Sequence, residues 1–427
     1  MERLLHYVWK YGLYDGGNLY TADGLPITVL DPGVRNPDAG PDFFNARIRV
    51  GDIVWAGSVE IHRRASEWHT HRHDRDPAYD SVVLHVVEDD DAQVRRTDGE
   101  VVRQAVIRVP SGVREQMEWL LSRDAPAPCL GLGRIRGIEP LHLSAWLGAL
   151  ASERLERKTD TVFALLERHG GDWNEVFYIT LTRSFGSGVN GDAFERLAES
   201  LPFHCICKHR DSRTAVEALL FGQAGLLAGV CGDDAYVRML QREYAFLQGK
   251  YRLLPLEGFL FRKLRMRPAN FPHVRLAQLA AIWSANDTLF SEILEDCQPA
   301  MLKNRFLTAV SAYWETHFHF GATSPPGKKP VGADTVNAVL INAVVPVLFA
   351  YGRKQRQPAY AARALQLLEE LPPERSRLVK TFADAGIEVK SAADTQALVQ
   401  LQREYCEKRK CLYCRIAYCL IRKYGRI

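Results

Sequence analysis

The sequence lacks the features that mark membrane, repetitive and exported proteins. Its most apolar window, Val336–Gly352, is interrupted by Asn337, Asn342 and Pro346, so it predicts a buried helix rather than a membrane span, and no membrane partner is expected. There is no internal repeat and no low-complexity tract. The first residues lack a cationic segment followed by a continuous apolar core, so no export signal is expected.

Neither sign of charge dominates the chain. The 55 Lys and Arg residues against 51 Asp and Glu residues leave a net charge of +4, so binding to a polyanion would depend on local patches. The nine cysteines are an odd number, and without an export signal they favour a reducing cytoplasm over disulfide bonds. The hydrophobic share of 47% is that of a globular protein, and 427 residues predict two or three domains.

Residues 1–128 are predicted to form an α+β domain with a small mixed sheet. Apolar residues at helical spacing begin it. Alternating apolar residues then predict strands at residues 44–50 and 53–61, joined by a Gly51-Asp52 turn. A nearly continuous apolar run at residues 81–88 predicts a strand that is covered on both faces.

Residues 129–427 are predicted to form a large, mostly α-helical region. A linker rich in proline and glycine precedes helical periodicity with few strand signals. Breaks are expected at residues 185–192, where Asp192 would cap the next helix, and at residues 267–273 and 323–332. The region ends in a basic tail that is rich in cysteine.

The first predicted hairpin carries residues that suit phosphodiester hydrolysis. Such hydrolysis uses a divalent metal held by carboxylates, together with a group that orients or activates water. Asp42 precedes the first strand. Glu60 and His62 share one face of the second strand, because residues i and i+2 point the same way. The alternative is that Glu60 and His62 form only a polar strand face.

The predicted register of this hairpin does not bring the acids together by itself. A two-residue turn pairs Phe44 with Val59 and puts Asp42 opposite Ile61, on the other face from Glu60. The site therefore requires a bend at Pro41 or a β-bulge, with Gly57 as the expected position of the bulge.

Long stretches of the chain resemble the bacterial domain-of-unknown-function family 2851. The motifs are NPDAGPDFFNARI, WAGSVEIHRRASEWHTHRHDRDPAYDSVVLHVV, RMRPANFPHVRLAQLA and INAVVPVLFAYG, and the likeness covers nearly the whole chain. The N-terminal part is also similar to the PD-(D/E)XK nuclease fold, whose αβββαβ core carries a helix glutamate, a strand aspartate and an acid-x-Lys triplet. This resemblance implies that Glu2 is the helix acid, that Asp42 and Glu60 bind Mg²⁺ or Mn²⁺, and that His62 stands where the lysine would be.

His62 is the departure from the nuclease pattern. As a cation it would need nearby carboxylates to raise its pKa, and it would then orient or activate water. As a neutral imidazole it would ligate metal and shift the preference from Mg²⁺ toward Mn²⁺ or Zn²⁺. Arg63 is a further candidate for the missing positive charge.

A second group of histidines follows the hairpin. His69, His71 and His73 alternate, which on a strand would align three imidazoles as zinc ligands. A second interpretation is that these histidines contact a substrate phosphate or surround a metal without ligating it, with Arg63 and Asp76 as further substrate-binding residues. A third is that they form a plain surface loop. His85, inside the predicted buried strand, is either a core histidine or a member of the site.

The C-terminal tail is a second candidate metal site. Its four cysteines could hold Zn²⁺ or an iron–sulfur cluster, as similar nucleases imply, with Cys129 as a distant partner, or they are core thiols. These are Cys406, Cys411, Cys414 and Cys419. Basic residues of the tail, and a second cluster from Arg262 to Arg275, could neutralise phosphates, although a solvated face is the simpler interpretation.

Three functions follow from these observations. The leading hypothesis is a metal-dependent phosphodiesterase, similar to a nuclease, that acts on nucleic acid. The alternative is a nucleic-acid-binding or scaffold protein on a nuclease fold that has lost catalysis, which His62 in place of lysine would explain. A third is a zinc-dependent hydrolase of another substrate. The sequence leaves open whether the protein has protein partners.

Overall fold

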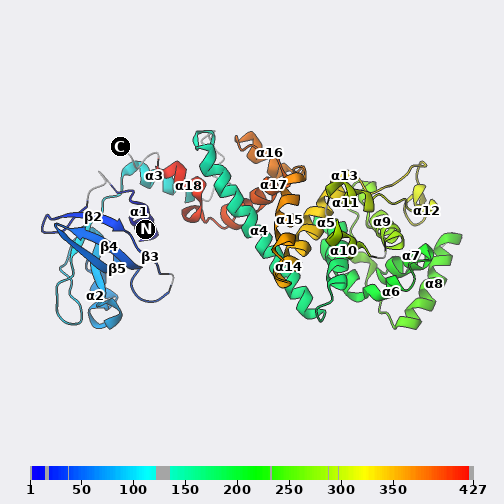
Figure 1. Ribbon diagram of the computed structural model, residues 1–427, viewed down its shortest axis with the longest axis horizontal. Coiled ribbons are helices and arrows are strands. Elements are labelled where there is room, and N and C mark those ends of the chain that lie inside the picture. The colour runs from blue at the N-terminus through cyan, green and yellow to red at the C-terminus, as the bar shows by residue number, and fades with distance from the viewer. Residues whose placement is uncertain are drawn as a thin grey trace. The chain divides into compact units, whose positions relative to one another are not determined.

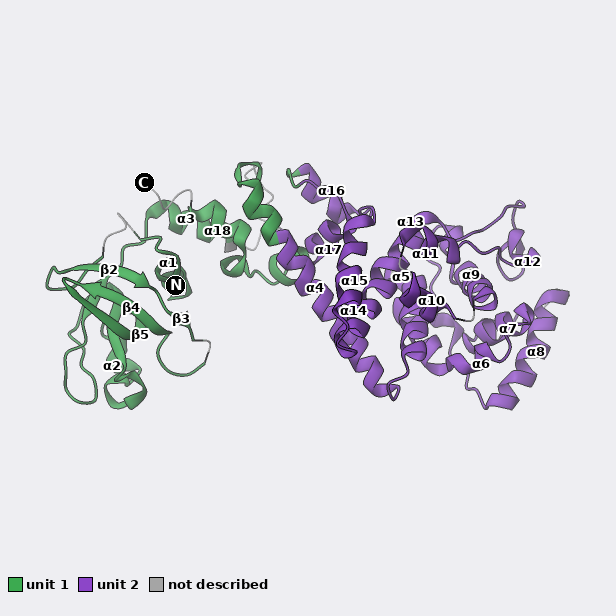
Figure 2. Ribbon diagram, in the orientation of Figure 1, with its two compact units in different colours: residues 1–146, 385–387, 401–427 green, residues 147–384, 388–400 purple. Residues whose placement is uncertain are grey.

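The computed structural model describes residues 2–14, 19–36, 38–121, 135–230, 233–286, 288–296 and 298–422. It divides into two compact units (Figure 2): unit 1 comprises residues 1–146, 385–387 and 401–427, and unit 2 comprises residues 147–384 and 388–400. The expected domain boundary after residue 128 lies outside the described residues.

The C-terminal tail belongs to unit 1, whereas the sequence grouped it with the helical region. The ring of Tyr418 packs against that of Tyr11 at 4.7 Å. The thiol of Cys411 donates a hydrogen bond to the carbonyl of Leu120 at 3.4 Å. Contacts between such distant segments have no local signal in the sequence.

Unit 1 is built on a mixed sheet, which confirms the expected α+β class (Figure 1). The strand order is β1-β2-β4-β5-β6-β7, and β3 pairs with β4. β5, β6 and β7 run parallel, whereas the other pairs are antiparallel. The strands are β1 (Leu19–Tyr20), β2 (Pro26–Asp31), β3 (Val34–Arg35), β4 (Phe43–Val50), β5 (Ile53–Arg64), β6 (Val82–Asp89) and β7 (Gln104–Val106).

Helices pack around this sheet. α1 covers part of β5 with its apolar stripe, and Gly12, at φ 59°, follows the end of the helix. The helices of unit 1 are α1 (Glu2–Tyr11), α2 (Glu67–Thr70), η2 (His73–Arg75), η3 (Pro77–Tyr79), α3 (Ser111–Leu121), η8 (Leu401–Cys406), η9 (Cys411–Tyr413) and α18 (Arg415–Arg422).

The hairpin of β4 and β5 has the predicted turn and an unpredicted register. Gly51 adopts φ 58°, and Val50 pairs with Ile53 as expected. Farther along, Ala46 pairs with Gly57 but Phe43 pairs with Val59, so β4 carries one extra residue. This bulge includes Asn45 at φ 56°. Phe43 is therefore buried in place of Phe44, and the face of every preceding residue is reversed.

The expected position of the bulge, at Gly57, was wrong. Gly57 instead allows the backbone just before β6 to pack closely against β5, because a Cβ atom there would lie 2.7 Å from the carbonyl oxygen of Ser81. The bulge forms in β4 because Asn45 is among the residue types that accept a left-handed conformation.

Unit 2 is almost entirely helical, as predicted, and packs around one large apolar core. It also contains a two-stranded sheet of β8 (His317–His319) and β9 (Ala322–Thr323). Its helices are α4 (Pro140–Arg168, from residue 147), α5 (Trp173–Ser200), α6 (Phe203–Cys207), α7 (Arg213–Gln223), α8 (Ala235–Tyr251), η5 (Gly258–Leu260), η6 (Pro268–Asn270), α9 (Pro272–Ala285), α10 (Leu289–Glu295), α11 (Pro299–Arg305), α12 (Ala312–Glu315), α13 (Ala333–Val339), η7 (Leu340–Val344), α14 (Val345–Lys354), α15 (Pro358–Glu370), α16 (Arg377–Asp384) and α17 (Ala392–Gln400).

One expected break in unit 2 was wrong. α5 runs without interruption through residues 185–192, and Asp192 is no N-cap but pairs with Arg183 on the same helix at 2.9 Å. The glycines there serve close packing, because a Cβ atom on Gly186 would lie 3.0 Å from the Cβ atom of Phe194. Side-chain packing thus outweighs the low helix propensity of glycine.

The apolar segment predicted as a buried helix is helical. Residues Ala333–Lys354 form a continuous helix of 22 residues, which is long and apolar enough, by composition alone, to cross a membrane. Its most apolar window has a mean hydropathy of 1.7, and 61% of that window is buried inside the protein.

Candidate metal centre

The bulge in β4 brings the two predicted acids of unit 1 together. The backbone N–H of Asp42 donates to Oε2 of Glu60 at 3.0 Å. In return the N–H of Ile61 donates to Oδ2 of Asp42 at 3.0 Å. Glu60 is only 5% exposed, and burial is the main reason that its pKa is raised, with the charge of Asp42 acting in the same direction.

The helix residue that reaches this pair is His6, not the expected Glu2. Glu2 is exposed, whereas His6 is buried one turn later and places Nε2 3.1 Å from Oδ2 of Asp42. Both residues lie on the same side of α1, because positions i and i+4 share a helix face. The i, i+4 spacing from Glu2 was the signal in the sequence that could have predicted His6 as a member of the site.

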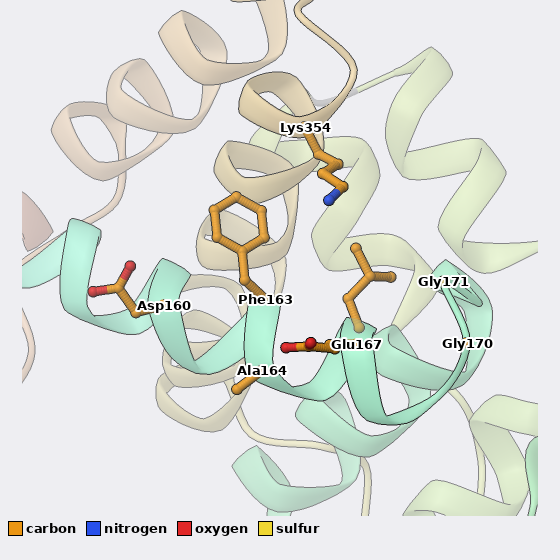
Figure 3. A pocket seen from close by; sticks show the side chains of 8 residues that line it. Asp160, Phe163, Ala164, Glu167, Gly170, Gly171 and Lys354 are labelled. Atoms are coloured by element: carbon orange, nitrogen blue, oxygen red, sulfur yellow. The ribbon is translucent and has the colours of Figure 1, made fainter.

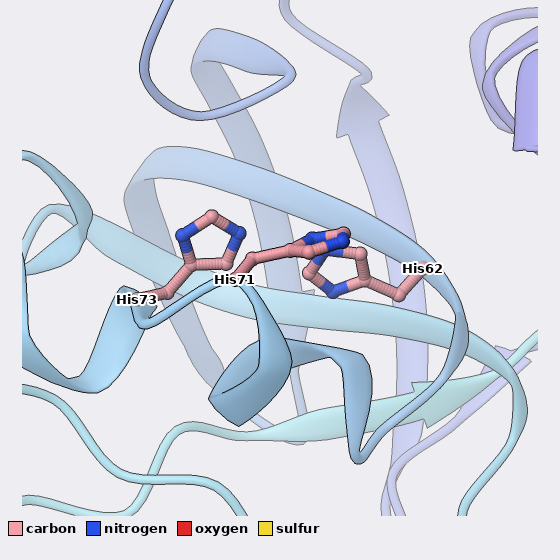
Figure 4. Close-up of side chains that lie close together, drawn as sticks. All are labelled: His62, His71 and His73. Carbon is pink, nitrogen blue, oxygen red and sulfur yellow. The ribbon is translucent and has the colours of Figure 1, made fainter.

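The segment that carries His69, His71 and His73, here called the histidine loop, folds into helical turns. Its alternating histidines therefore do not align as on a strand. α2 is followed by Arg72 in a left-handed conformation at φ 62°, and η2 begins at His73. His69 consequently faces Asp74, with Nδ1 3.6 Å from Oδ2. His71 and His73 turn toward His62 on β5 (Figure 4).

Three imidazoles meet at this point. His62, His71 and His73 each offer a nitrogen atom within 4.8 Å of the other two. Nε2 of His62 lies 3.1 Å from Nδ1 of His71. Oε1 of Glu60 lies 3.4 Å from Nε2 of His62 and 3.4 Å from Nε2 of His73. His73 stacks on the ring of Tyr79 at 3.7 Å, which fixes its orientation.

His85 completes the group from the neighbouring strand. It is fully buried, and its Nε2 lies 2.9 Å from Nδ1 of His62. Burial, together with the neighbouring histidines, lowers the pKa of His62 to about 3 and that of His85 to about 2. Both rings are therefore neutral at pH 7. Of the two states that the sequence left open for His62, the lowered pKa favours the neutral one, because burial outweighs the attraction of Asp42.

Two other candidates point away from the cluster. Arg63 is exposed and directs its guanidinium to Glu88 on β6 at 3.9 Å, so it does not supply the charge of the missing lysine. Asp76 is exposed and caps η3 by accepting a hydrogen bond from the N–H of Ala78 at 2.9 Å. Neither contacts the imidazoles in the structure.

The tail cysteines lie on several short elements. Cys406 ends η8, Cys411 begins η9, Cys414 follows η9 and Cys419 lies within α18. Among the residues that the structure describes, His62, His71 and His73 bring three ligand atoms within 4.8 Å of one another. The described tail cysteines do not form a second group of three ligand atoms at this distance. Cys129, their expected distant partner, lies outside the described residues.

A separate hollow of about 760 Å³ lies on unit 2. Figure 3 shows Asp160 and Glu167 on α4 and Lys354 at the end of α14 around it. These three charged residues are exposed, and its lining contains no histidine or cysteine. Among the described residues, the lining of this hollow therefore offers no group of metal ligands.

Comparison with known proteins gives one match. Residues 2–377 match the model of a family described as protein of unknown function (DUF2851). No curated protein matches the chain, and no solved structure matches it. The similarity of unit 1 to the PD-(D/E)XK nuclease fold therefore stays a prediction from the sequence.

Proposed function

The chain belongs to the DUF2851 family, and we propose that it is a metal-dependent phosphodiesterase, similar to a nuclease, that acts on nucleic acid. The observation that carries this proposal is the meeting of three imidazole nitrogens within 4.8 Å of one another beside the buried carboxylate of Glu60. A carboxylate that is buried among imidazole lone pairs is costly unless a cation shares the site.

The donor set favours a particular class of cation. Imidazole nitrogens suit Mn²⁺ and Zn²⁺, whereas Mg²⁺ prefers oxygen ligands. We therefore assign Mn²⁺ or Zn²⁺ to His62, His71, His73 and Glu60, instead of the Mg²⁺ that the carboxylate pair alone would suit. When bound, such a cation polarises a phosphoryl oxygen and lowers the pKa of a water molecule.

The two acids have different roles in this proposal. Glu60 directs Oε1 to the imidazoles, while the N–H of Asp42 holds Oε2. Asp42 lies on the other side, where its carboxylate orients His6. The His6–Asp42 pair is therefore the group that we assign to proton transfer with water or the leaving group.

The substrate would approach from the side of His71. His71 is exposed, while His62 and His73 are buried, so the cluster opens to solvent at this residue. Arg72, the next residue, is also exposed, and within the described part of the chain it has no ion-pair partner. A cation at this position suits a phosphate of the substrate.

The histidine loop provides a matched test of the metal centre. Replacing His71 by alanine is expected to weaken Mn²⁺ or Zn²⁺ binding by at least about 100-fold, because a ligand is lost. His69→Ala is the control: both histidines are exposed on the same loop, but His69 faces Asp74. Calorimetric titration of metal into protein stripped with EDTA measures both affinities. Equal affinities in the two variants would contradict the assignment.

The activity is tested with the same metals on labelled single-stranded and duplex DNA and RNA. Metal-dependent cleavage that is lost in His71→Ala and in Asp42→Asn, but kept in His69→Ala, is the expected result. Tight metal binding without cleavage of any of these substrates would reject the activity. Metal-independent binding of nucleic acid without cleavage would favour the non-catalytic alternative.

His85 is expected to act as a positioning residue for His62. If Nε2 of His62 binds the cation, its hydrogen sits on Nδ1 and is donated to Nε2 of His85, 2.9 Å away. His85→Leu removes this acceptor and is expected to weaken metal binding by roughly 10-fold or more. His85→Gln keeps an acceptor and should restore part of that loss in the same titration. A purely structural role would instead lower the thermal stability in EDTA without any such rescue.

A further inference from the structure

Unit 2 contains a concentrated group of cations that the proposed metal centre does not use. We define the cationic loop as residues 258–270, which comprise η5, η6 and the segment between them. Within it the four exposed cations are Arg262, Lys263, Arg265 and Arg267. Residues 258–275 contain no Asp or Glu, and among the described residues these four side chains have no ion-pair partner. Glu257 directly precedes the loop, so four cations stand against one neighbouring acid.

The cationic loop is held in a fixed conformation. Asn190 of α5, only 2% exposed, accepts a hydrogen bond from the N–H of Arg262 at 2.8 Å and donates to its carbonyl at 2.9 Å. Gly225 adopts φ 70° and lies so close to the loop that a Cβ atom there would be 2.9 Å from the N–H of Gly258. These contacts position the cations in advance, which lowers the entropy cost of binding a ligand.

A buried arginine adds positive charge beneath the loop. Arg275 of α9 is 7% exposed and donates to Asn270 at 2.7 Å, to Thr335 at 2.9 Å and to Gln278 at 2.9 Å. All three acceptors are neutral, and no carboxylate in the described part of the chain pairs with it. A guanidinium buried without a counter-charge is costly, and a polyanion bound at the loop would reduce that cost.

Apolar side chains stand among the cations. Phe259 is 77% exposed and Leu264 is 82% exposed. Large apolar groups on a rigid, exposed loop indicate a contact surface. A strand of nucleic acid matches both features, because phosphates pair with arginine and lysine while bases pack on an aromatic ring.

We propose that the cationic loop of unit 2 is a binding surface for single-stranded nucleic acid, in which Arg262, Lys263, Arg265 and Arg267 contact phosphates and Phe259 contacts a base. The choice of nucleic acid as the polyanion rests on the proposed function. The surface itself is independent of the metal centre, because its residues all belong to unit 2.

The test uses the full chain in EDTA, so that binding is measured without cleavage. Fluorescence anisotropy gives the affinity for labelled 20-nucleotide DNA and RNA strands between 50 and 300 mM salt. The triple variant Lys263→Gln, Arg265→Gln, Arg267→Gln is expected to bind roughly 10-fold more weakly. The slope of log affinity against log salt should decrease by about 2, since each lost phosphate contact removes about 0.7.

Two further variants sharpen the interpretation. Arg196→Gln, Lys354→Gln, Arg356→Gln removes three exposed cations of unit 2 outside the loop and should bind like the native protein. Phe259→Ala should weaken binding while leaving the salt slope unchanged, because the lost contact carries no charge.

The outcomes separate this inference from the proposed function. If the loop variant binds as tightly as its control, the inference is overturned, whether or not the native protein cleaves nucleic acid. Loop-dependent binding without metal-dependent cleavage would support the inference and reject the proposed function. Binding of the loop to vesicles containing phosphatidylserine, with no affinity for nucleic acid, would overturn the inference in favour of a membrane surface.

Discussion

Replacing Glu60 by glutamine is expected to lower metal-dependent hydrolysis by roughly a thousandfold without destabilising the metal-free protein. The loss follows because Oε1 of Glu60 lies 3.4 Å from the ring nitrogens of both His62 and His73, where the proposed cation needs a negative charge. An amide at this position keeps the shape but neither the charge nor a strong ligand atom. Initial rates with Mn²⁺ on a labelled oligonucleotide measure the effect.

The stability of Glu60→Gln in EDTA is not expected to fall with its activity. Burial raises the pKa of Glu60 above its ordinary value of 4.5, so the folded protein favours the protonated acid. Ionisation of Glu60 therefore destabilises the metal-free native protein: its free energy of unfolding decreases as the pH rises from about 4.5 through the raised pKa. Glutamine resembles the protonated acid but cannot ionise, so the variant does not lose this stability at higher pH. At pH 7 the variant should be at least as stable as the native protein.

A nearby acid serves as the control for this substitution. Glu67 accepts hydrogen bonds from the backbone N–H groups of Arg63 and Arg64, at 3.0 and 3.2 Å, and does not contact the imidazoles in the structure. Glu67→Gln should keep both metal affinity and activity. Full activity in Glu60→Gln, or equal losses in both variants, would refute the role of Glu60 as a ligand.

The hairpin shows how far local pattern predicts the fold. The positions of the two strands and the Gly51-Asp52 turn were correct, because both depend on neighbouring residues. Alternation also required an irregularity, since Asp42 and Glu60 otherwise faced opposite sides. Alternation did not predict where the bulge lies. Asn45 can adopt several backbone conformations, and its pairing with β5 selects the left-handed one.

The histidine cluster depends on contacts that the sequence does not display. Strand spacing suggested that His69, His71 and His73 align, but the loop is helical and separates His69 from the other two. His6 lies more than 30 residues from Asp42 in the chain, and helical periodicity indicates only that His6 is buried, not what it meets. Residue types therefore pointed to the chemistry, while tertiary packing selected the members of the cluster.

Acid is expected to destabilise unit 2 through His273, the second large effect. His273 on α9 is 6% exposed, and the rings of Phe320 and Trp314 lie 5.3 and 6.3 Å away. Burial, followed by the charges of Lys263 and His319, lowers the pKa of His273 from 6.5 to about 3. Between these values the unfolded chain takes up a proton that the folded protein does not. Stability is therefore full above about pH 6.5 and is lost progressively as the pH falls toward 3.

Acidification from pH 7 to pH 4 should thus remove roughly 3 kcal/mol through this one residue. His273→Leu fills the apolar site without a titrating group, so its free energy of unfolding should depend less on pH than that of the native protein. Chemical denaturation followed by circular dichroism, in EDTA, gives both curves, and the difference between them isolates His273 from the histidines of unit 1. His204→Asn is the control, because His204 is an exposed histidine of the same unit. Parallel curves for His273→Leu and the native protein would show that His273 becomes charged without cost, and that the aromatic cage around it opens to water in acid.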